Sequence, residues 1–365
     1  MSDSSSSIIP EEGALLSLPG QQGMPRQTWM IRGATKRSSR PNLGSFSLYS
    51  PDFFLDDPKP WFIPENPAIL KASAEPSIDS TSFQPLALDW EPPSSAFFEE
   101  CFQDLQTLFR SGRLTKAVPV FFEQAAFSLS QSHLAQWISI LLHAPETLTP
   151  YGRWSAEGGI LGASPELLFE IRGGVLSTVA LAGTLAAPET SDPAALLSLE
   201  NTFMADPKER REHRLVIDGI VDSLAPFGSV TVGETSVLKL PTLWHLKTPL
   251  EVALREAPDF ESLVHSLHPT PALGGSPRDA SLQWLRRLDE RQKPNSGRGS
   301  FGAPFGAQLP DGSAFCLVAV RNMMWDTKTL RIGAGCGIIQ ESRMEREWEE
   351  LRQKRASVKK LFDLQ

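Results

Sequence analysis

Cysteine is scarce in this sequence of 365 residues, and the three cysteines, Cys101, Cys316 and Cys336, are far apart. This number and spacing exclude a disulfide framework, and without a Cys-x-x-Cys pair no zinc site is expected. No apolar run approaches the roughly 18 residues that a membrane-spanning helix needs. The N-terminal residues lack the cationic segment and apolar stretch of a secretory signal. We therefore expect a cytoplasmic protein that does not bind membranes.

The chain also has fewer basic than acidic residues. Asp and Glu outnumber Lys and Arg by 43 to 35, which gives a formal net charge of -8. Non-specific binding to nucleic acid requires a basic surface, so no nucleic-acid partner is expected. Apolar residues make up 41% of the chain and charged residues 21%, which is typical of a globular protein. The length suits one large domain or two small ones.

Two regions differ in composition. Residues 1–90 are rich in Pro and Ser and predict short strands and long loops, with residues 1 to about 25 mobile in part. Residues 91–365 contain no further linker and form the expected main domain, on which the N-terminal region packs. Strands and helices are mixed without a regular alternation, which favours an α+β fold over a doubly wound sheet.

Hydrophobic periodicity predicts the positions of the helices and strands. A period of 3.6 predicts helices over residues 97–111, 134–142, 206–224, 260–267, 280–288 and 342–362. Ser342 followed by Glu345 predicts a capping box at the start of the last helix. Strand patterns cover residues 114–122, 229–240, a hairpin of 160–171 with 175–181, and a pair formed by 315–324 and 330–339. The two glycines at 173 and 174 mark the hairpin turn.

Two ionisable residues lie on apolar strand patterns. Lys116 shares a face with apolar residues of the run RLTKAVPVFF, and Glu166 follows a proline in GASPELLFEI. Each has two interpretations: an exposed charge on an edge strand, or a desolvated group. A buried Lys116 with a lowered pKa could act as a base, and a buried Glu166 with a raised pKa could act as a general acid.

Two Glu-x-x-Glu pairs lie on separate predicted helices. Glu209 and Glu212 share one helix face, as do Glu347 and Glu350, with Lys354 one turn after Glu350. A solvated face with ion pairs is the common fate of such residues. The alternative is a binding site for Mg²⁺, because four carboxylates beside apolar stretches repel one another unless a cation neutralises them.

A third cation and a glycine-rich stretch follow. Arg321 is expected to share a strand face with Phe315 and Leu317, and arginine suits the capture of a substrate carboxylate. The glycines between 333 and 337 allow backbone amides to approach an anion.

The order of these motifs resembles the chorismate-utilising enzymes, and most closely the isochorismate synthases. The resemblance extends from Phe98 to Leu361 and rests on the runs TKAVPV, ASPELL, ALAGT, KERREH, PTLWHLKTP with HPTPALGG, and GAGCGII followed by Glu-x-x-Glu-x-x-x-Lys. It implies a large α+β domain of antiparallel sheets flanked by helices, as in anthranilate synthase component I. It further implies a dianionic substrate, chorismate, and Mg²⁺ as cofactor.

The resemblance also implies residue roles. Lys116 would activate water, Glu166 would protonate the departing 4-hydroxyl group, and Glu212 and Glu350 would bind Mg²⁺ with help from Glu209 and Glu347. The remaining implied residues contact the substrate. Arg321, Lys354 and the backbone at Gly335, Cys336 and Gly337 would hold its carboxylates, and Leu181, Gly183, Thr184, His245 and Ala272 would line its ring pocket.

Two positions point to the subfamily. The aminodeoxychorismate synthases carry a reactive lysine where this chain has Ala182, and the anthranilate synthases typically carry glutamine where it has Lys116. The chain departs from the isochorismate synthases at Phe121, where an arginine is common, and at Met344, where a proline is usual. The resemblance implies no glutaminase subunit, and we expect a monomer.

Two alternatives stay open at this point. One is a salicylate-forming enzyme that eliminates pyruvate from isochorismate in the same pocket, although the run HPTPALGG argues against it. The other is a non-catalytic relative that binds a metabolite, against which the presence of Lys116, Glu166 and the four glutamates argues. The sequence is consistent with a product that enters menaquinone, siderophore or salicylate biosynthesis.

Overall fold

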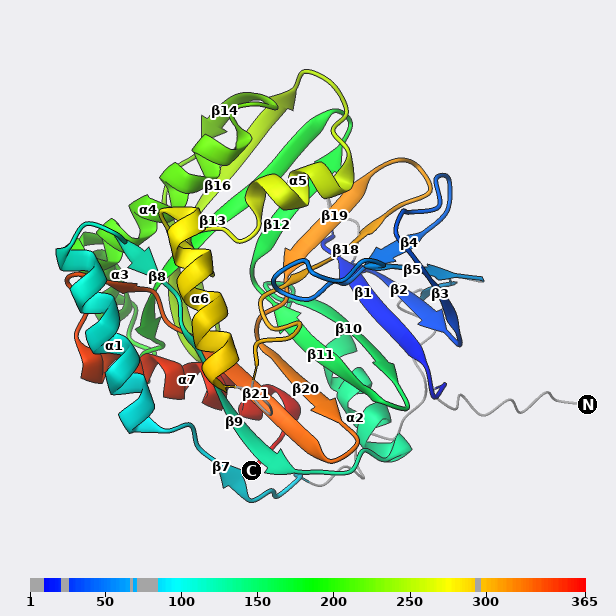
Figure 1. Ribbon diagram of the computed structural model, residues 1–365, viewed down its shortest axis with the longest axis horizontal. Coiled ribbons are helices and arrows are strands. Elements are labelled where there is room, and N and C mark those ends of the chain that lie inside the picture. Colours follow the sequence, from blue (N-terminus) through cyan, green and yellow to red (C-terminus); the bar gives the residue numbers. More distant parts are fainter. Residues whose placement is uncertain (1–9, 21–25, 66–67, 71–84, 293–296) are drawn as a thin grey trace, which may run out of the picture.

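Two large antiparallel sheets, flanked by helices, make up the protein (Figure 1). The computed structural model describes residues 10–20, 26–65, 68–70, 85–292 and 297–365. This architecture confirms the predicted α+β class with antiparallel sheets. Within the described residues, no helix is long and apolar enough to cross a membrane.

The first sheet has nine strands in the described part of the chain. Their spatial order is β6 (Ala68–Leu70), β2 (Gln27–Arg32), β1 (Gly13–Leu18), β10 (Thr149–Ser155), β11 (Gly158–Ser164), β20 (Asn322–Asp326), β21 (Thr329–Gly335), β9 (Val120–Ala126) and β7 (Trp90–Glu91). Strands from the beginning, middle and end of the chain therefore lie side by side.

The second sheet has ten described strands. Nine follow the order β14 (Gly228–Val232), β16 (Leu243–Leu254), β13 (Val175–Ala186), β12 (Leu167–Arg172), β19 (Ala314–Val318), β18 (Pro304–Gln308), β4 (Ser47–Tyr49), β5 (Trp61–Pro64) and β3 (Thr35–Ser38). The tenth, β15 (Ser236–Lys239), also pairs with β16. A small third sheet has the order β17 (Gly275–Ser276), β8 (Lys116–Ala117) and β22 (Ile338–Ile339).

The described residues form seven α-helices: α1 (Ser95–Arg110), α2 (Gln131–Leu142), α3 (Pro193–Ala205), α4 (Pro207–Leu224), α5 (Phe260–Leu267), α6 (Arg278–Gln292) and α7 (Met344–Phe362). Six of them match predicted helices, and α3 was not predicted. Helix α4 packs on β13 and α5, and α7 packs on β21 and α1. The predicted hairpin turn is also confirmed, because Gly173 and Gly174 join β12 to β13 with positive φ angles of 55° and 80°.

Four predicted strands are wrong in the same way. The patterns over residues 114–122, 160–171, 315–324 and 330–339 each predicted one strand, but each divides into two strands of different sheets. Three breaks fall at Pro119, at Pro165 and at Arg321, whose φ angle is 55°, and the fourth falls at residues 336–337. A proline donates no ladder hydrogen bond and a positive φ turns the chain, so each of the first three breaks lets an apolar run cross from one sheet to another. Arg321 therefore does not lie on a strand face.

The capping box at the last helix is also wrong. Helix α7 begins after Arg343, which occupies the N-cap position and makes no side-chain hydrogen bond to the helix. The hydroxyl of Ser342 instead accepts a hydrogen bond from the backbone amide of Ile339 at 3.1 Å. By contrast, Asp206 caps α4 as a side-chain acceptor for the amides of Lys208 and Glu209.

The N-terminal region contributes to both sheets. All six residues of β1 are buried, and β1 is an inner strand of the first sheet. That residues 1 to about 25 are mobile in part stays a prediction. Residues 1–9 and 21–25, to which the same expectation applied, lie outside the described residues. Strands β1, β2 and β6 belong to the first sheet and β3, β4 and β5 to the second. The division of the chain at residue 90 stays a proposal.

Candidate active site

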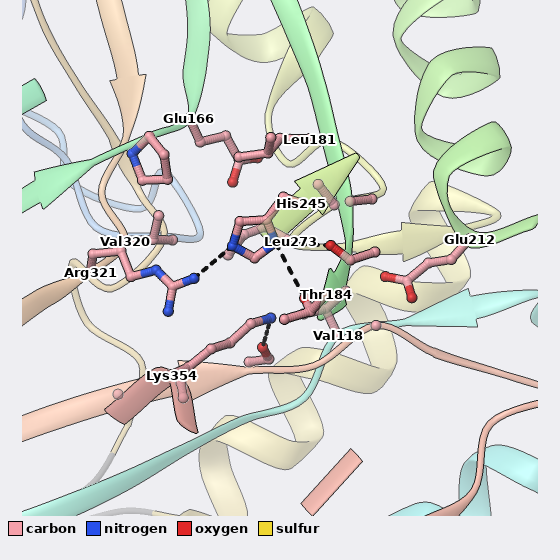
Figure 2. A pocket seen from close by; sticks show the side chains of 18 of the residues that line it. Val118, Glu166, Leu181, Thr184, Glu212, His245, Leu273, Val320, Arg321 and Lys354 are labelled. Atoms are coloured by element: carbon pink, nitrogen blue, oxygen red, sulfur yellow. Dashed lines mark hydrogen bonds between the residues drawn. The ribbon is translucent and has the colours of Figure 1, made fainter. Parts of the chain in front are cut away.

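A cavity lies where the strand breaks meet α4 and α7, and Figure 2 shows charged side chains converging on it. Each of the four unpredicted breaks contributes to its wall, through Val118, Glu166, Arg321 and Gly337. Besides Glu166, Arg321 and Gly337, the residues of the predicted site that line it are Leu181, Gly183, Thr184, Glu212, His245, Ala272, Gly335 and Lys354. The sequence motifs therefore identified most of the residues that line the cavity, although the strands predicted to carry those residues were wrong.

Glu166 points into the cavity from the junction of β11 and β12 (Figure 2). Its backbone amide donates to the hydroxyl of Ser164 at 3.1 Å, and that hydroxyl donates to the carbonyl of Val318 at 2.7 Å. Burial raises the pKa of the Glu166 carboxyl to about 7, although the positive charges of Lys354, Lys116 and Arg321 oppose the shift. Glu166 is half-buried at the cavity wall, and with this pKa it can carry a proton near neutral pH.

His245 connects two walls of the cavity. Its Nδ1 lies 2.8 Å from the carbonyl oxygen of Gly183, and its Nε2 lies 2.9 Å from Nη2 of Arg321. Burial lowers the pKa of His245 to about 3, so the ring is neutral. A carbonyl oxygen can only accept a hydrogen bond and a guanidinium can only donate one, so one tautomer of the ring is consistent with both partners. In it, Nδ1–H donates to Gly183, and Nε2 accepts from Arg321.

Arg321 and Lys354 supply positive charge to one side of the cavity. Burial lowers the pKa of Arg321 to about 10, which leaves the guanidinium charged at neutral pH. Its Nη1 donates to the hydroxyl of Ser357 on α7 at 3.2 Å. Lys354 Nζ lies 2.8 Å from the carbonyl of Gly335 and 2.6 Å from Oε1 of Glu350. Two cations that line one cavity are suited to a dicarboxylate ligand.

The four glutamates lie beside the cavity, on the first two turns of α4 and α7. Glu212 lines the cavity, whereas Glu209, Glu347 and Glu350 line an adjoining groove that shares Thr184 with it. Thr184 lines both the cavity and the groove and holds two of the glutamates. Its amide donates to Glu209 at 3.0 Å, and its hydroxyl donates to Glu350 at 3.1 Å. The solvated-face interpretation is wrong for Glu212 and Glu347, which are 6% and 1% exposed.

Lys116 is fully buried in the middle strand of the three-stranded sheet, so it is not an exposed lysine of an edge strand. Its Nζ donates to Oε1 of Glu212 at 3.1 Å. Gly337 makes this approach possible, since a Cβ atom there would lie 2.0 Å from that oxygen and 2.9 Å from Cε of Lys116. Lys116 contacts the cavity through Glu212 and does not line it.

The carboxylate cluster fits a hard divalent cation. Burial, together with repulsion from neighbouring carboxylates, raises the pKa of Glu209 and of Glu347 to about 7. Oε2 of Glu347 is buried without a hydrogen-bond partner. Within the described residues, no three His, Cys, Asp or Glu side chains already converge as a finished metal site. One carboxylate, Glu212, differs, because ion pairs with Lys116 and Lys208 outweigh its burial and lower its pKa to about 2.

Sequence reasoning missed part of the site. Cys336, expected at the substrate, is fully buried and lines neither the cavity nor the groove. The wall also includes residues that were not predicted: Val118, Pro165, Leu273, Phe301, Val320 and Ala334. Lys208 was missed as well, although its position four residues before Glu212 could have indicated an ion pair.

Comparison with known proteins agrees with this geometry. The model of the family described as chorismate binding enzyme matches residues 48–360. The chain belongs to the chorismate binding enzymes. A salicylate biosynthesis isochorismate synthase of Pseudomonas aeruginosa is 37% identical over 192 residues, which are 52% of this chain and 39% of that protein. The chain therefore matches less than half of that relative's length.

Solved structures of chorismate binding enzymes share the fold. The menaquinone-specific isochorismate synthase MenF of Escherichia coli superimposes with a TM-score of 0.78 at 22% identity, covering 98% of this chain and 90% of that one. Anthranilate synthase component I of Streptococcus pneumoniae superimposes with a TM-score of 0.71 at 16% identity, covering 99% and 95%. The fold expected from the resemblance is thereby confirmed.

Proposed function

We propose that this protein is a magnesium-dependent isochorismate synthase, which converts chorismate to isochorismate. The observation that carries the proposal is the placement of Glu166, whose pKa lies near neutrality, opposite Arg321 and Lys354 in one cavity beside four carboxylates. Membership of the chorismate binding enzymes and 37% identity to an isochorismate synthase support it. Cytoplasmic location and the monomeric state are predictions of the same proposal.

Each group has a role in this reaction. Arg321 and Lys354 bind carboxylate groups of the dianionic substrate, and neutral His245 holds Arg321 in place. Glu212 and Glu350, assisted by Glu209 and Glu347, hold Mg²⁺. When bound, the cation acts as a Lewis acid on the ring carboxylate and stabilises the charge that develops there.

Two proton transfers complete the isomerisation. Lys116 takes a proton from the water molecule that attacks C2, and for this its amine must first lose its own proton and give up the ion pair with Glu212. The ring double bonds shift, and Glu166 donates its proton to the hydroxyl group that leaves C4. One water molecule enters and one leaves, so the product is an isomer of the substrate and the reaction is reversible.

The test is to incubate the protein with chorismate and Mg²⁺, with and without a chelator, and to separate the products by liquid chromatography. We expect isochorismate in the presence of Mg²⁺ and none with the chelator. Salicylate together with pyruvate would instead indicate the lyase reaction, and undiminished turnover in chelator would remove the metal role of the four glutamates. No product under any condition would overturn the proposal.

Lys116→Met tests the base while keeping the length of the buried side chain. We expect turnover to fall by about 10²-fold or more, because a positioned base contributes roughly that factor. Lys239→Met is the control, since Lys239 pairs with Glu200 on the surface at 2.6 Å, away from the cavity. Near wild-type turnover of Lys116→Met would contradict its role.

A further inference from the structure

Lys208 lies among the carboxylates that would hold the metal. From the first turn of α4, its Nζ lies 3.2 Å from Oε1 of Glu209, 3.0 Å from Oε2 of Glu212 and 3.3 Å from Oε1 of Glu347. These three carboxylates come from two helices that are far apart in the sequence. The ammonium group of Lys208 thus bridges the two halves of the cluster.

The ammonium group of Lys208 is held among negative charges in a largely buried place. Oxygen atoms of three carboxylates lie within 3.3 Å of its Nζ, and its side chain is 19% exposed. The positive charge of Lys208 offsets the mutual repulsion of these carboxylates, which water screens poorly at a buried site. A divalent cation bound to these oxygens would lie within a few ångströms of the ammonium group, where the two positive charges repel strongly.

We propose that Lys208 is an internal counter-ion that occupies the carboxylate cluster in the metal-free protein and must leave it when the divalent cation binds. Lys208 therefore competes with the metal: it keeps the cluster together while the metal is absent, and it lowers the affinity of the site for Mg²⁺. This inference rests on the magnesium site of the proposed function and adds the residue that sets how tightly the site binds.

The location of Lys208 allows such a movement. Its side chain is 19% exposed and lines the adjoining groove rather than the cavity. The ammonium group sits on a flexible four-carbon stem, so rotation of that stem can carry it into the groove without a shift of the backbone. Lys116, the other lysine that contacts Glu212, is fully buried and has no such route.

Calorimetric titration of Mg²⁺ alone into the metal-free protein measures the competition. We would compare the wild type, Lys208→Met and Arg211→Met in one buffer at about pH 8, above the ordinary pKa of a carboxyl group. Arg211 is a matched control because it lies on the same helix but pairs with exposed Glu341, at 3.2 Å. We expect Lys208→Met to bind Mg²⁺ at least about tenfold more tightly than the wild type, and Arg211→Met to change little.

Thermal melting provides an independent measurement. Metal-free Lys208→Met should melt at a lower temperature than the wild type, and Mg²⁺ should raise its melting temperature by more. In the wild type, acylation of the Lys208 amine, followed by mass spectrometry, should be slow without Mg²⁺ and faster with it. This last readout needs no variant and holds even if Lys208→Met folds poorly.

The outcomes separate the inference from the function on which it rests. Equal or weaker Mg²⁺ binding by Lys208→Met, with an amine reactivity that Mg²⁺ does not change, would overturn the inference and leave the metal site standing. No Mg²⁺ binding by either protein would overturn both.

Discussion

At the scale of single residues, protonation of Glu166 should limit the reaction at high pH. The acid must carry its proton, and burial places its pKa at about 7 with Lys354, Lys116 and Arg321 opposing the shift. The protonated form therefore predominates below that pH and disappears above it. We expect kcat/KM to fall as the pH rises through about 7, which a pH–rate profile of the free enzyme would measure.

Glu166→Gln keeps the size of this side chain and removes the proton. We expect its kcat/KM to fall by about 10²-fold or more, and its residual rate to lose the alkaline decrease seen in the wild type. Glu170→Gln is the control, because Glu170 lies on β12 and pairs with Arg172 at 2.5 Å. An unchanged alkaline limb in Glu166→Gln would assign the pH dependence to another group.

At the same scale, the surroundings of Lys116 could not be deduced from the residues next to it. Its neighbours in sequence allowed either an exposed or a buried amine, and its partner Glu212 lies on a helix almost a hundred residues away. The ion pair exists because β8 lies in the middle of its sheet and because Gly337 leaves room for both side chains. Only long-range packing could distinguish the two interpretations.

At the scale of elements, the N-terminus of α7 lacks a side-chain cap, and supplying one should stabilise the protein. Arg343 occupies the N-cap position with extended φ and ψ angles of -114° and 128°, but its side chain caps nothing. Arg343→Ser should supply the missing acceptor and raise the free energy of unfolding by about 1 kcal/mol. Urea denaturation would measure this change.

Arg346→Ser is the matched control for that prediction. It removes the same charge from the same exposed end of α7 at a position inside the helix, where serine cannot cap. We expect it to be neutral or slightly destabilising, because serine is a poorer helix former than arginine. A similar gain from both variants would mean that charge rather than capping is responsible.

At the scale of the whole molecule, β1 joins the two main apolar clusters. Leu15 packs in the cluster around Trp137 and Trp154, and Leu16, on the opposite face of the strand, packs in the larger cluster. Both side chains are at most 1% exposed. A strand near the N-terminus therefore contributes to the packing on both faces of the first sheet.

Leu16→Ala should accordingly be costly. Truncation of a fully buried leucine typically lowers the free energy of unfolding by about 2–5 kcal/mol, which chemical denaturation would measure. Leu43→Ala is the control, since Leu43 is 77% exposed and its loss should change stability by about 0.5 kcal/mol or less. A small effect of Leu16→Ala would show that β1 is dispensable for the fold.

Local sequence patterns were sufficient to predict six of the seven described helices and to name most of the residues that line the cavity. Helical periodicity and a local cap such as Asp206 depend on residues within a few positions, and these contacts form whatever the rest of the chain does. The motifs likewise named Glu166, His245, Arg321 and Lys354, which line one cavity.

The tertiary structure alone decided where apolar runs divide between sheets and which charges meet. A continuous run such as residues 315–324 satisfies a strand pattern in either sheet, so only its pairing partners, β12 and β18 on one side and β11 and β21 on the other, place the break at Arg321. The contacts of Lys208 also depend on tertiary structure, because Glu347 belongs to a helix that only the complete fold brings to α4. Such contacts follow from the packing of distant segments, which no local pattern encodes.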